Sequence, residues 1–391
     1  MPVLEKSSAR SLSRAGDFLA LLLLVGILAG AGWVWWHQKH PKKSFKHKSP
    51  PSAVVVKKSI APPPAAPVVR KVEPVKTASE TASISLASPA AKTTQSFSPA
   101  VSGTEFPRPV HGMLETQIAL ARRAISPGSI DGAVGSQTRA AIAAFQRSEQ
   151  LSETVALDTN TRPRLTLEAP LLADYIVTTN DLARLQPLGK TWLAKSEQSA
   201  LEYETVLELV AEKAHSHPLL IQKLNPEVNW SNVVAGTVLK IPEVIYPEPV
   251  DKAAFVVIHL LGKFLEAFGG ETNLLLHCPC SIAARVEKRP VGELHVKDIA
   301  PHPNYTFDPA VFPESPEAQA VGRKLILQPG PNNPVGVAWI SLDRPGYGMH
   351  GTPSPEQVGR TESHGCFRLA NWDAEYLVKL VWVGMPVEVL P

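Results

Sequence analysis

The chain has 391 residues, of which 44% are hydrophobic and 19% charged, and its formal net charge is +3. Residues 1–76 carry 13 Lys and Arg against 3 Asp and Glu, so the remainder of the chain is net acidic. Because the basic part has no globular pattern, this distribution argues against a nucleic-acid-binding domain and favours a segment at a membrane or in solvent. Three cysteines are too few for a disulfide scaffold.

The N-terminal region predicts a membrane anchor. A short tail (1–17) precedes residues 18–36, which carry no charge and end in a run with three tryptophans. About 20 apolar residues span a bilayer as a helix, and Trp favours the interface. Since no clean small-residue cleavage site follows, we expect an uncleaved, single-pass signal anchor. More basic residues follow the run than precede it, so charge alone would keep the C-terminal side in the cytoplasm.

Residues 37–108 predict a disordered linker rich in Pro, Ala, Ser and Lys. The segment has no apolar period, so it cannot bury enough surface to offset the entropy lost on ordering. We expect it to act as a tether.

Residues 109–168 predict a small helical domain. Two amphipathic stretches flank the turn SPGSIDG, and Ser136 is a candidate N-cap of the second, whose Ala141, Ile142 and Phe145 share one face. The pattern resembles the three-helix peptidoglycan-binding domain, at Gly128, Ile130, Asp131, Gly132, Gly135, Thr138, Ala141, Ile142, Phe145 and Gln146. Most of these residues build the bundle, so the pattern identifies a fold more firmly than a ligand.

Residues 169–249 predict a smaller α+β segment. Two helical stretches end at Asn225-Pro226, and residues 238–241 are typical of a closing strand. This arrangement resembles a LysM domain, which grips amino-sugar chains, at Asn225, Pro226, Gly236, Leu239, Ile241 and Pro242. The stretch YETVLEL lacks the Gly-Asp turn expected after a first strand. Glycan binding and simple packing against neighbouring domains both remain open.

Residues 250–391 predict a mostly β domain with one late helix. AFVVIHL and FLEAFGG form a predicted hairpin around Gly262-Lys263, and further short strands follow between proline-rich loops. A helix is expected from about Trp372 to Gly384, before a last strand.

Cys366 lies in a polar, glycine-containing loop, HGTPSPEQVGRTESHGCFR, where a buried structural thiol is not expected. A cysteine attacks as the thiolate and needs an activating neighbour, for which His350 and His364 are candidates. The backbone N–H groups at Gly365 and Cys366 could face an oxyanion, and Arg368 could bind a carboxylate through its planar fork.

This cluster resembles the catalytic domain of the L,D-transpeptidases, the YkuD family. The family pattern is met by His350, Gly351, Thr352, Gly359, Ser363, His364, Gly365, Cys366 and Arg368. Upstream, the GP-x-NP-x-G loop is matched by Pro331, Asn333, Pro334 and Gly336, and Tyr347 precedes the HGT motif. One departure is Arg289, in RPVG, where the family usually has threonine; it lies far from the thiol along the chain.

The resemblance implies a β-sandwich-like fold and a two-step acyl transfer without a cofactor or metal. Cys366 would attack the bond before the terminal D-alanine of a stem tetrapeptide, and an amine of a second stem would take the acyl group. His350 would accept and return the proton. We expect the substrate and oxyanion site to involve Ser363, His364, Gly365, Arg368, Gly351 and Tyr347, with His364 positioning the loop.

Several alternatives share these residues. Water as the acceptor would make an L,D-carboxypeptidase, and a protein lysine would make a protein-to-wall transferase. A non-catalytic wall-binding scaffold, an inert Cys366 and a metal site at His277, Cys278 and Cys280 are further readings. A peptidoglycan substrate requires the globular part to lie outside the inner membrane, so the chemistry favours a periplasmic location against the charge rule. The expected partners are stem peptides, glycan strands and, through one helix, the membrane.

Overall fold

The computed structural model describes residues 105–312, 315–361, 363 and 365–391. The predicted tail, the anchor and nearly all of the linker lie outside these ranges, as does His364. None of the helices within the described ranges has the length and apolar character needed to cross a bilayer.

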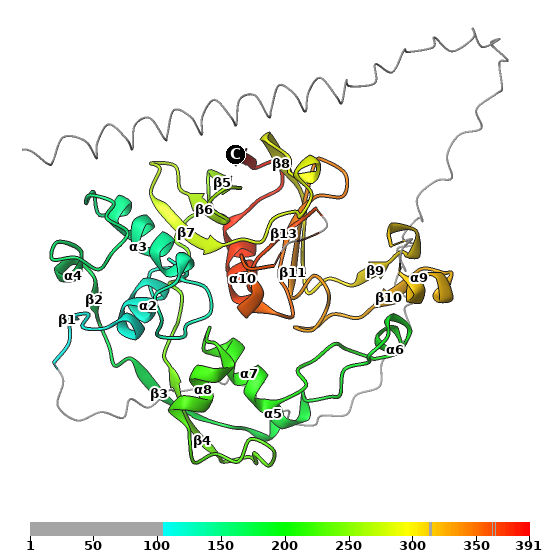
Figure 1. Cartoon of the computed structure of the whole chain (residues 1–391), viewed down its shortest axis with the longest axis horizontal. Coiled ribbons are helices and arrows are strands. Elements are labelled where there is room, and N and C mark those ends of the chain that lie inside the picture. Colours follow the sequence, from blue (N-terminus) through cyan, green and yellow to red (C-terminus); the bar gives the residue numbers. More distant parts are fainter. Residues whose placement is uncertain (1–104, 313–314, 362, 364) are drawn as a thin grey trace, which may run out of the picture. The chain divides into compact units, whose positions relative to one another are not determined.

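The helical domain has the three predicted helices, closed by a short strand pair (Figure 1). Its elements are β1 (Arg108–Pro109), α2 (Met113–Ala121), α3 (Ser136–Ser148), α4 (Thr161–Arg164) and β2 (Thr166–Leu167). The predicted apolar face of α3 is buried, with Ala141, Ile142 and Phe145 at most 1% exposed. The N-cap prediction is wrong: Gly135 is the N-cap, and Ser136 is the first helical residue.

The middle segment, residues 169–249, pairs its first strand with its last around a set of short helices. Its elements are β3 (Leu172–Ile176), α5 (Thr179–Ala183), α6 (Trp192–Ser196), α7 (Val206–Lys213), α8 (Pro218–Leu224) and β4 (Val238–Pro242). Strands β3 and β4 are antiparallel. The first strand therefore lies about 30 residues upstream of YETVLEL, which instead leads into α7. Asn225 ties the end of α8 to β4 by bonding Ile221 O and Lys240 O, both at 2.8 Å.

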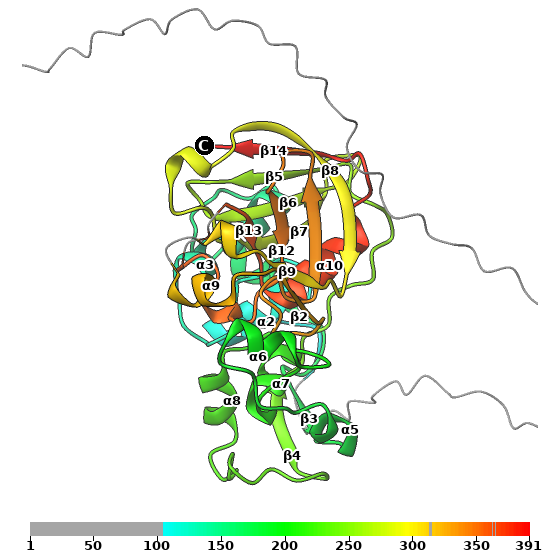
Figure 2. The ribbon, with the colours of Figure 1, turned by 90° about the vertical axis from the view of Figure 1, so that its right-hand side faces the viewer.

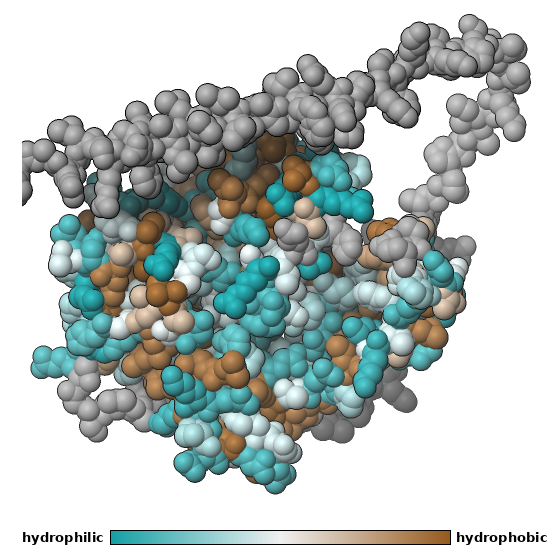
Figure 3. Space-filling model, viewed as in Figure 1, coloured by the Kyte–Doolittle hydropathy of each residue, from teal (hydrophilic) through white to brown (hydrophobic). Residues whose placement is uncertain are grey.

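The surface of the middle segment carries several exposed apolar side chains. Ile176 and Val238 are register partners on β3 and β4 and are 57% and 53% exposed, and Leu219 on α8 is 67% exposed. In Figure 3, hydrophobic residues (brown) gather on the face that covers these elements. Part of this segment's apolar surface is therefore left in solvent.

The C-terminal domain is built on one eight-stranded sheet of order β13-β12-β11-β8-β14-β5-β6-β7 (Figures 1 and 2). Its strands are β5 (Phe255–His259), β6 (Phe264–Phe268), β7 (Leu274–Pro279), β8 (Gly292–Pro301), β11 (Ala338–Leu342), β12 (Gly348–His350), β13 (Phe367–Arg368) and β14 (Pro386–Leu390). The prediction of a mostly β domain is confirmed. The expected β-sandwich-like arrangement of two separate sheets is not what the structure has: the sheet is continuous, because the long strand β8 pairs with β14 over its first part and with β11 over its second.

Three further elements and one long helix complete the domain. A small subdomain contains β9 (Tyr305–Phe307), α9 (Pro316–Val321) and β10 (Leu325–Leu327). The late helix α10 (Asn371–Leu380) is shorter than expected, because Val381 already has extended backbone and Gly384 adopts a φ of +95° before β14. Cys278 and Cys280 are both fully buried in the core of the sheet.

The first turn of α10 binds the helical domain and the middle segment. The Asp373 carboxylate accepts from the hydroxyls of Tyr246 at 2.7 Å and Ser126 at 3.1 Å. The Trp372 ring stacks on His215 with centroids 5.0 Å apart. Buried polar groups with satisfied partners fix one arrangement of the surrounding chain, so these contacts hold the three parts of residues 105–391 together.

Asp373→Asn should remove a pH-dependent part of the stability. Burial raises the pKa of Asp373 to about 7, so the folded protein holds this proton more tightly than the unfolded chain does. Its stabilising effect is complete below the ordinary carboxyl pKa and is lost as pH rises through about 7, an effect on the order of 4 kcal/mol. Asparagine can still accept from the Tyr246 hydroxyl through Oδ1 and donate to the Ser126 oxygen through Nδ2, but it cannot ionise.

Urea unfolding of the full chain at pH 5 and pH 8 measures this effect. The wild type should lose more stability between these pH values than Asp373→Asn, whereas Asp298→Asn, at an exposed position, should follow the wild type. Parallel pH curves for the wild type and Asp373→Asn would contradict the assignment.

Candidate active site

The loop before β13 is organised by the side chain of Ser363. This buried hydroxyl donates to the carbonyl oxygen of Cys366 at 2.5 Å and accepts from the N–H of Gly365 at 3.2 Å. The backbone of Ser363 is itself bonded to Ile282 and Ala284. The Gly365 N–H is therefore already paired, which differs from the expectation that it faces an oxyanion. Ser363 instead fixes the turn that presents Cys366.

Cys366 opens into a cavity of about 470 Å³, a volume typical of small-ligand sites. Four other residues of the predicted site, His350, Ser363, Gly365 and Arg368, line the same cavity. Much of the remaining wall is aromatic, from Trp192, Tyr305, Phe312 and Trp339. The structure thus brings together side chains that a nucleophilic mechanism needs, next to an apolar surface.

Tyr347 and Gly351 do not line this cavity. Tyr347 packs against the core of the sheet, and the Arg344 guanidinium lies 4.9 Å from its ring centroid. The Gly351 carbonyl accepts from Nδ1 of His350 at 2.6 Å. Both residues therefore contact the residues around the cavity without lining it themselves.

His350 is held as a neutral base. A carbonyl oxygen only accepts, so the bond to Gly351 places the proton on Nδ1 and leaves the lone pair on Nε2. Burial, the largest influence, and the nearby charge of Arg368 together lower the pKa of His350 to about 4, against the opposing effect of the bond to Gly351. The ring also stacks on Trp339 with centroids 5.4 Å apart. The imidazole is consequently fixed in orientation and unprotonated at neutral pH.

The thiol of Cys366 is subject to opposing influences. Burial raises its pKa, whereas the backbone N–H of Gly348 and the charge of Arg368 lower it. The sulfur also lies 3.5 Å from the carbonyl oxygen of Gly346, to which the thiol donates. Burial is the largest of these effects, so the resting pair is a neutral thiol beside a neutral imidazole, with groups in place to stabilise negative charge on sulfur.

Comparison with known proteins identifies two parts of the chain. Residues 254–389 match the model of the L,D-transpeptidase catalytic domain, YkuD, and residues 112–165 match that of a peptidoglycan binding domain. The chain carries an L,D-transpeptidase catalytic domain. The predictions of this family and of an enzyme of this class are confirmed.

Individual relatives carry the same name. L,D-transpeptidase YkuD of Bacillus licheniformis is 27% identical over 188 residues, covering 48% of this chain and 94% of that protein. L,D-transpeptidase YbiS of Escherichia coli is 30% identical over 174 residues, covering 43% of this chain and 54% of that protein, so the chain spans about half the length of YbiS. The solved L,D-transpeptidase from Mycobacterium smegmatis is 19% identical, with a TM-score of 0.28, over 41% of this chain and 65% of that one.

The departure at Arg289 lies closer to the L,D-transpeptidase site than its sequence position suggested. Its guanidinium donates to the carbonyl oxygens of Ala283 at 2.7 Å and Ala284 at 3.2 Å. The same stretch bonds the backbone of Ser363. Arg289 therefore braces the strand-like segment on which the Cys366 loop rests.

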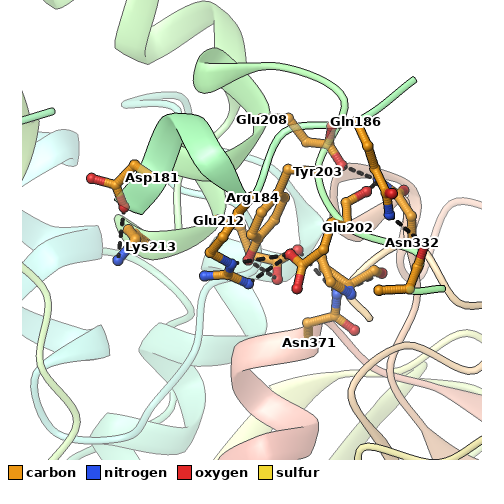
Figure 4. Close-up of polar contacts among 12 residues, drawn as sticks. Asp181, Arg184, Gln186, Glu202, Tyr203, Glu208, Glu212, Lys213, Asn332 and Asn371 are labelled. Atoms are coloured by element: carbon orange, nitrogen blue, oxygen red, sulfur yellow. Dashed lines mark hydrogen bonds and ion pairs between the residues drawn. The ribbon is translucent and has the colours of Figure 1, made fainter. Parts of the chain in front are cut away.

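Sequence reasoning missed Asn371, which lies behind the HGT motif. Its Oδ1 accepts from the N–H of Thr352 at 3.0 Å and of Val337 at 3.3 Å, and its Nδ2 donates to Glu212 at 3.0 Å (Figure 4). Gly336, at a φ of +62°, passes so close that a Cβ would lie 2.0 Å from Asn371 Oδ1. Asn371 thus joins the backbone next to His350 to helix α7 of the middle segment. Its only sequence signal is its position at a helix start.

The metal alternative finds no support within the described residues. No group of three or more His, Cys, Asp and Glu side chains in these ranges could hold an ion. His277 instead bonds Glu266 through Nδ1 at 3.1 Å, and its two neighbouring cysteines pack in the core.

Arg368→Gln should move the pH profile of Cys366 alkylation to higher pH. The guanidinium lowers the pKa of the thiol, so its removal leaves less thiolate at a given pH. Iodoacetamide labelling of the full chain, followed by mass spectrometry, should be slower by severalfold at pH 8. Cys366→Ala gives the background, and Arg323→Gln, at an exposed position, should match the wild type. An unshifted profile would show that Arg368 does not act on the sulfur.

Proposed function

We propose that this protein cross-links peptidoglycan stem peptides through a thioester on Cys366. The observation that carries the proposal is the shared cavity of Cys366, His350 and Arg368, with the imidazole proton held on Nδ1 by Gly351. This arrangement leaves Nε2 available as a general base in a site that already carries a nucleophile and a cation.

The first step is acyl transfer to sulfur. As Sγ attacks the carbonyl carbon before the terminal D-alanine, Nε2 of His350 takes the thiol proton. Because both groups rest in their neutral forms, the proton moves as the C–S bond forms. Arg368 and the Gly348 N–H stabilise the negative charge on the sulfur. His350 then gives the proton to the departing D-alanine amine, and a thioester remains.

The second step transfers the acyl group to an amine of another stem peptide. His350 accepts a proton from the attacking amine, and the sulfur leaves as the C–S bond breaks and takes that proton from His350, which restores the neutral thiol and imidazole. Water or a protein lysine could take the place of that amine, so the acceptor defines whether the protein is a transpeptidase, a carboxypeptidase or a protein-to-wall transferase. The oxyanion contact in both steps falls to the Cys366 N–H, with Ser363 shaping the loop.

The remaining parts of the chain fit a wall-associated enzyme. The match to a peptidoglycan binding domain supports contact with the wall. The pairing of β3 with β4 around α7 and α8, and the fixed position of Asn225, support a LysM-like role for the middle segment. The apolar run 18–36 supports a single-pass anchor in the inner membrane, with the catalytic domain in the periplasm.

Mass spectrometry of the products tests the reaction. Full-length protein incubated with a disaccharide-tetrapeptide should give a dimer that lacks one D-alanine, and Cys366→Ala should give none. His350→Ala should reduce the rate by at least about a hundredfold, because the general base is lost. Exposed His302→Ala is the matched control.

The alternatives give distinct results in the same experiment. A tripeptide monomer without dimer would identify a carboxypeptidase. If the wild type forms neither product nor acyl-enzyme, the result would favour a non-catalytic wall-binding scaffold.

A further inference from the structure

One loop of the middle segment extends away from the hydrophobic core of that segment. The base of this loop is closed by the N–H of Gln186, which donates to Tyr203 O at 3.0 Å, and by the Arg184–Glu202 ion pair at 2.8 Å (Figure 4). Between these contacts, residues 187–202, here called the crossing loop, form a compact excursion whose ends are close. Gln198 stiffens it by bonding Gly189 N at 2.8 Å and Pro187 O at 2.9 Å.

The crossing loop packs into the catalytic domain. Leu201 is fully buried in a cluster with Phe307, Leu325 and Leu327, whereas the core of the middle segment is made of other residues. Its backbone donates to Pro329 O and accepts from Asn332 N, both at 2.9 Å. Helix α6 at the tip accordingly lies against β9, β10 and α9 (Figure 1).

Trp192 begins α6 and reaches the cavity of Cys366. Its ring stacks on Phe307, with centroids 4.5 Å apart and planes 13° apart, and its backbone N–H donates to the Glu317 carboxylate. Thr191 caps the helix by accepting from Ala194 N at 3.1 Å, which fixes the position of the ring. The residue is only half-buried, and it lines the cavity together with Cys366 and Arg368.

We propose that Trp192 is a substrate-contacting residue of the catalytic site, supplied by the middle segment, and that it binds the aliphatic part of the acyl-donor peptide. This inference rests on the proposed function. The cavity wall holds the neighbouring rings of Trp192, Tyr305 and Phe312, and the cations Arg368 and Lys288 line the same cavity. Such a surface suits an anionic peptide with aliphatic side chains, because the rings remove apolar groups from water while the cations pair with carboxylates.

Kinetics of Trp192→Ala in the full-length protein test the proposal. With a disaccharide-tetrapeptide, kcat/KM should fall about tenfold, mainly through KM, because a ground-state contact is removed. Trp192→Phe should recover most of the loss, and Leu193→Ala, a 40% exposed neighbour on α6 outside the cavity, should match the wild type. Iodoacetamide labelling of Cys366 should be unchanged in all three variants, since this small reagent needs no aromatic contact.

Two results would overturn the proposal. One is an unchanged KM in Trp192→Ala. The other is a parallel loss of labelling, turnover and melting temperature, which would give Trp192 a purely structural role.

A measurement of tetrapeptide binding tests this inference independently of the proposed function. If the wild type forms no product, the proposed function fails, and tetrapeptide affinity is then measured by calorimetry in Cys366→Ala with and without Trp192→Ala. About tenfold weaker binding in the double variant would uphold the Trp192 contact, and equal binding would refute it.

Discussion

The first turn of α10 is the contact on which the arrangement of residues 105–391 depends. Three consecutive residues contact four partners: Asn371 binds Glu212 of α7, Trp372 stacks on His215, and Asp373 binds Ser126 of the helical domain and Tyr246. Asn371, Asp373 and Ser126 are buried, so a shift of one part would leave these hydrogen-bonding groups unsatisfied at a cost of about 1–3 kcal/mol each. The helix N-terminus also favours nearby carboxylates.

The first turn of α10 also contacts the backbone that orients the catalytic-site residue His350. Asn371 holds the backbone of Thr352 and Val337, and the adjacent Gly351 carbonyl sets the tautomer of His350. A side chain at position 336 would displace Asn371, which explains why a glycine with positive φ is needed there. The base is thus oriented by a chain of short contacts that begins in the middle segment, and the nucleophile is oriented separately by Ser363.

The middle segment therefore packs as one unit with the catalytic domain. Burial raises the pKa of Glu212 to about 7, and its carboxylate bonds both Tyr203 at 3.0 Å and Asn371 at 3.0 Å. The crossing loop adds Leu201 to the core of the small subdomain and Trp192 to the cavity wall. Independent modules on a tether would not need these buried contacts with the catalytic domain. A substrate-binding site built from two segments does need them.

The sequence by itself determined the local features of this protein. The spacing of His350, Ser363, Cys366 and Arg368, the glycines of their loops and the alternating strands of the C-terminal domain are short-range patterns, and the structure places these four side chains around one cavity. Only the tertiary structure decided that β8 joins two halves of one sheet, that Gly365 N–H is bound to Ser363, and that Asn371, Glu212 and Trp192 support or line the site. These contacts join residues that are far apart in the sequence or depend on how a loop closes, and neither periodicity nor motif spacing encodes such packing.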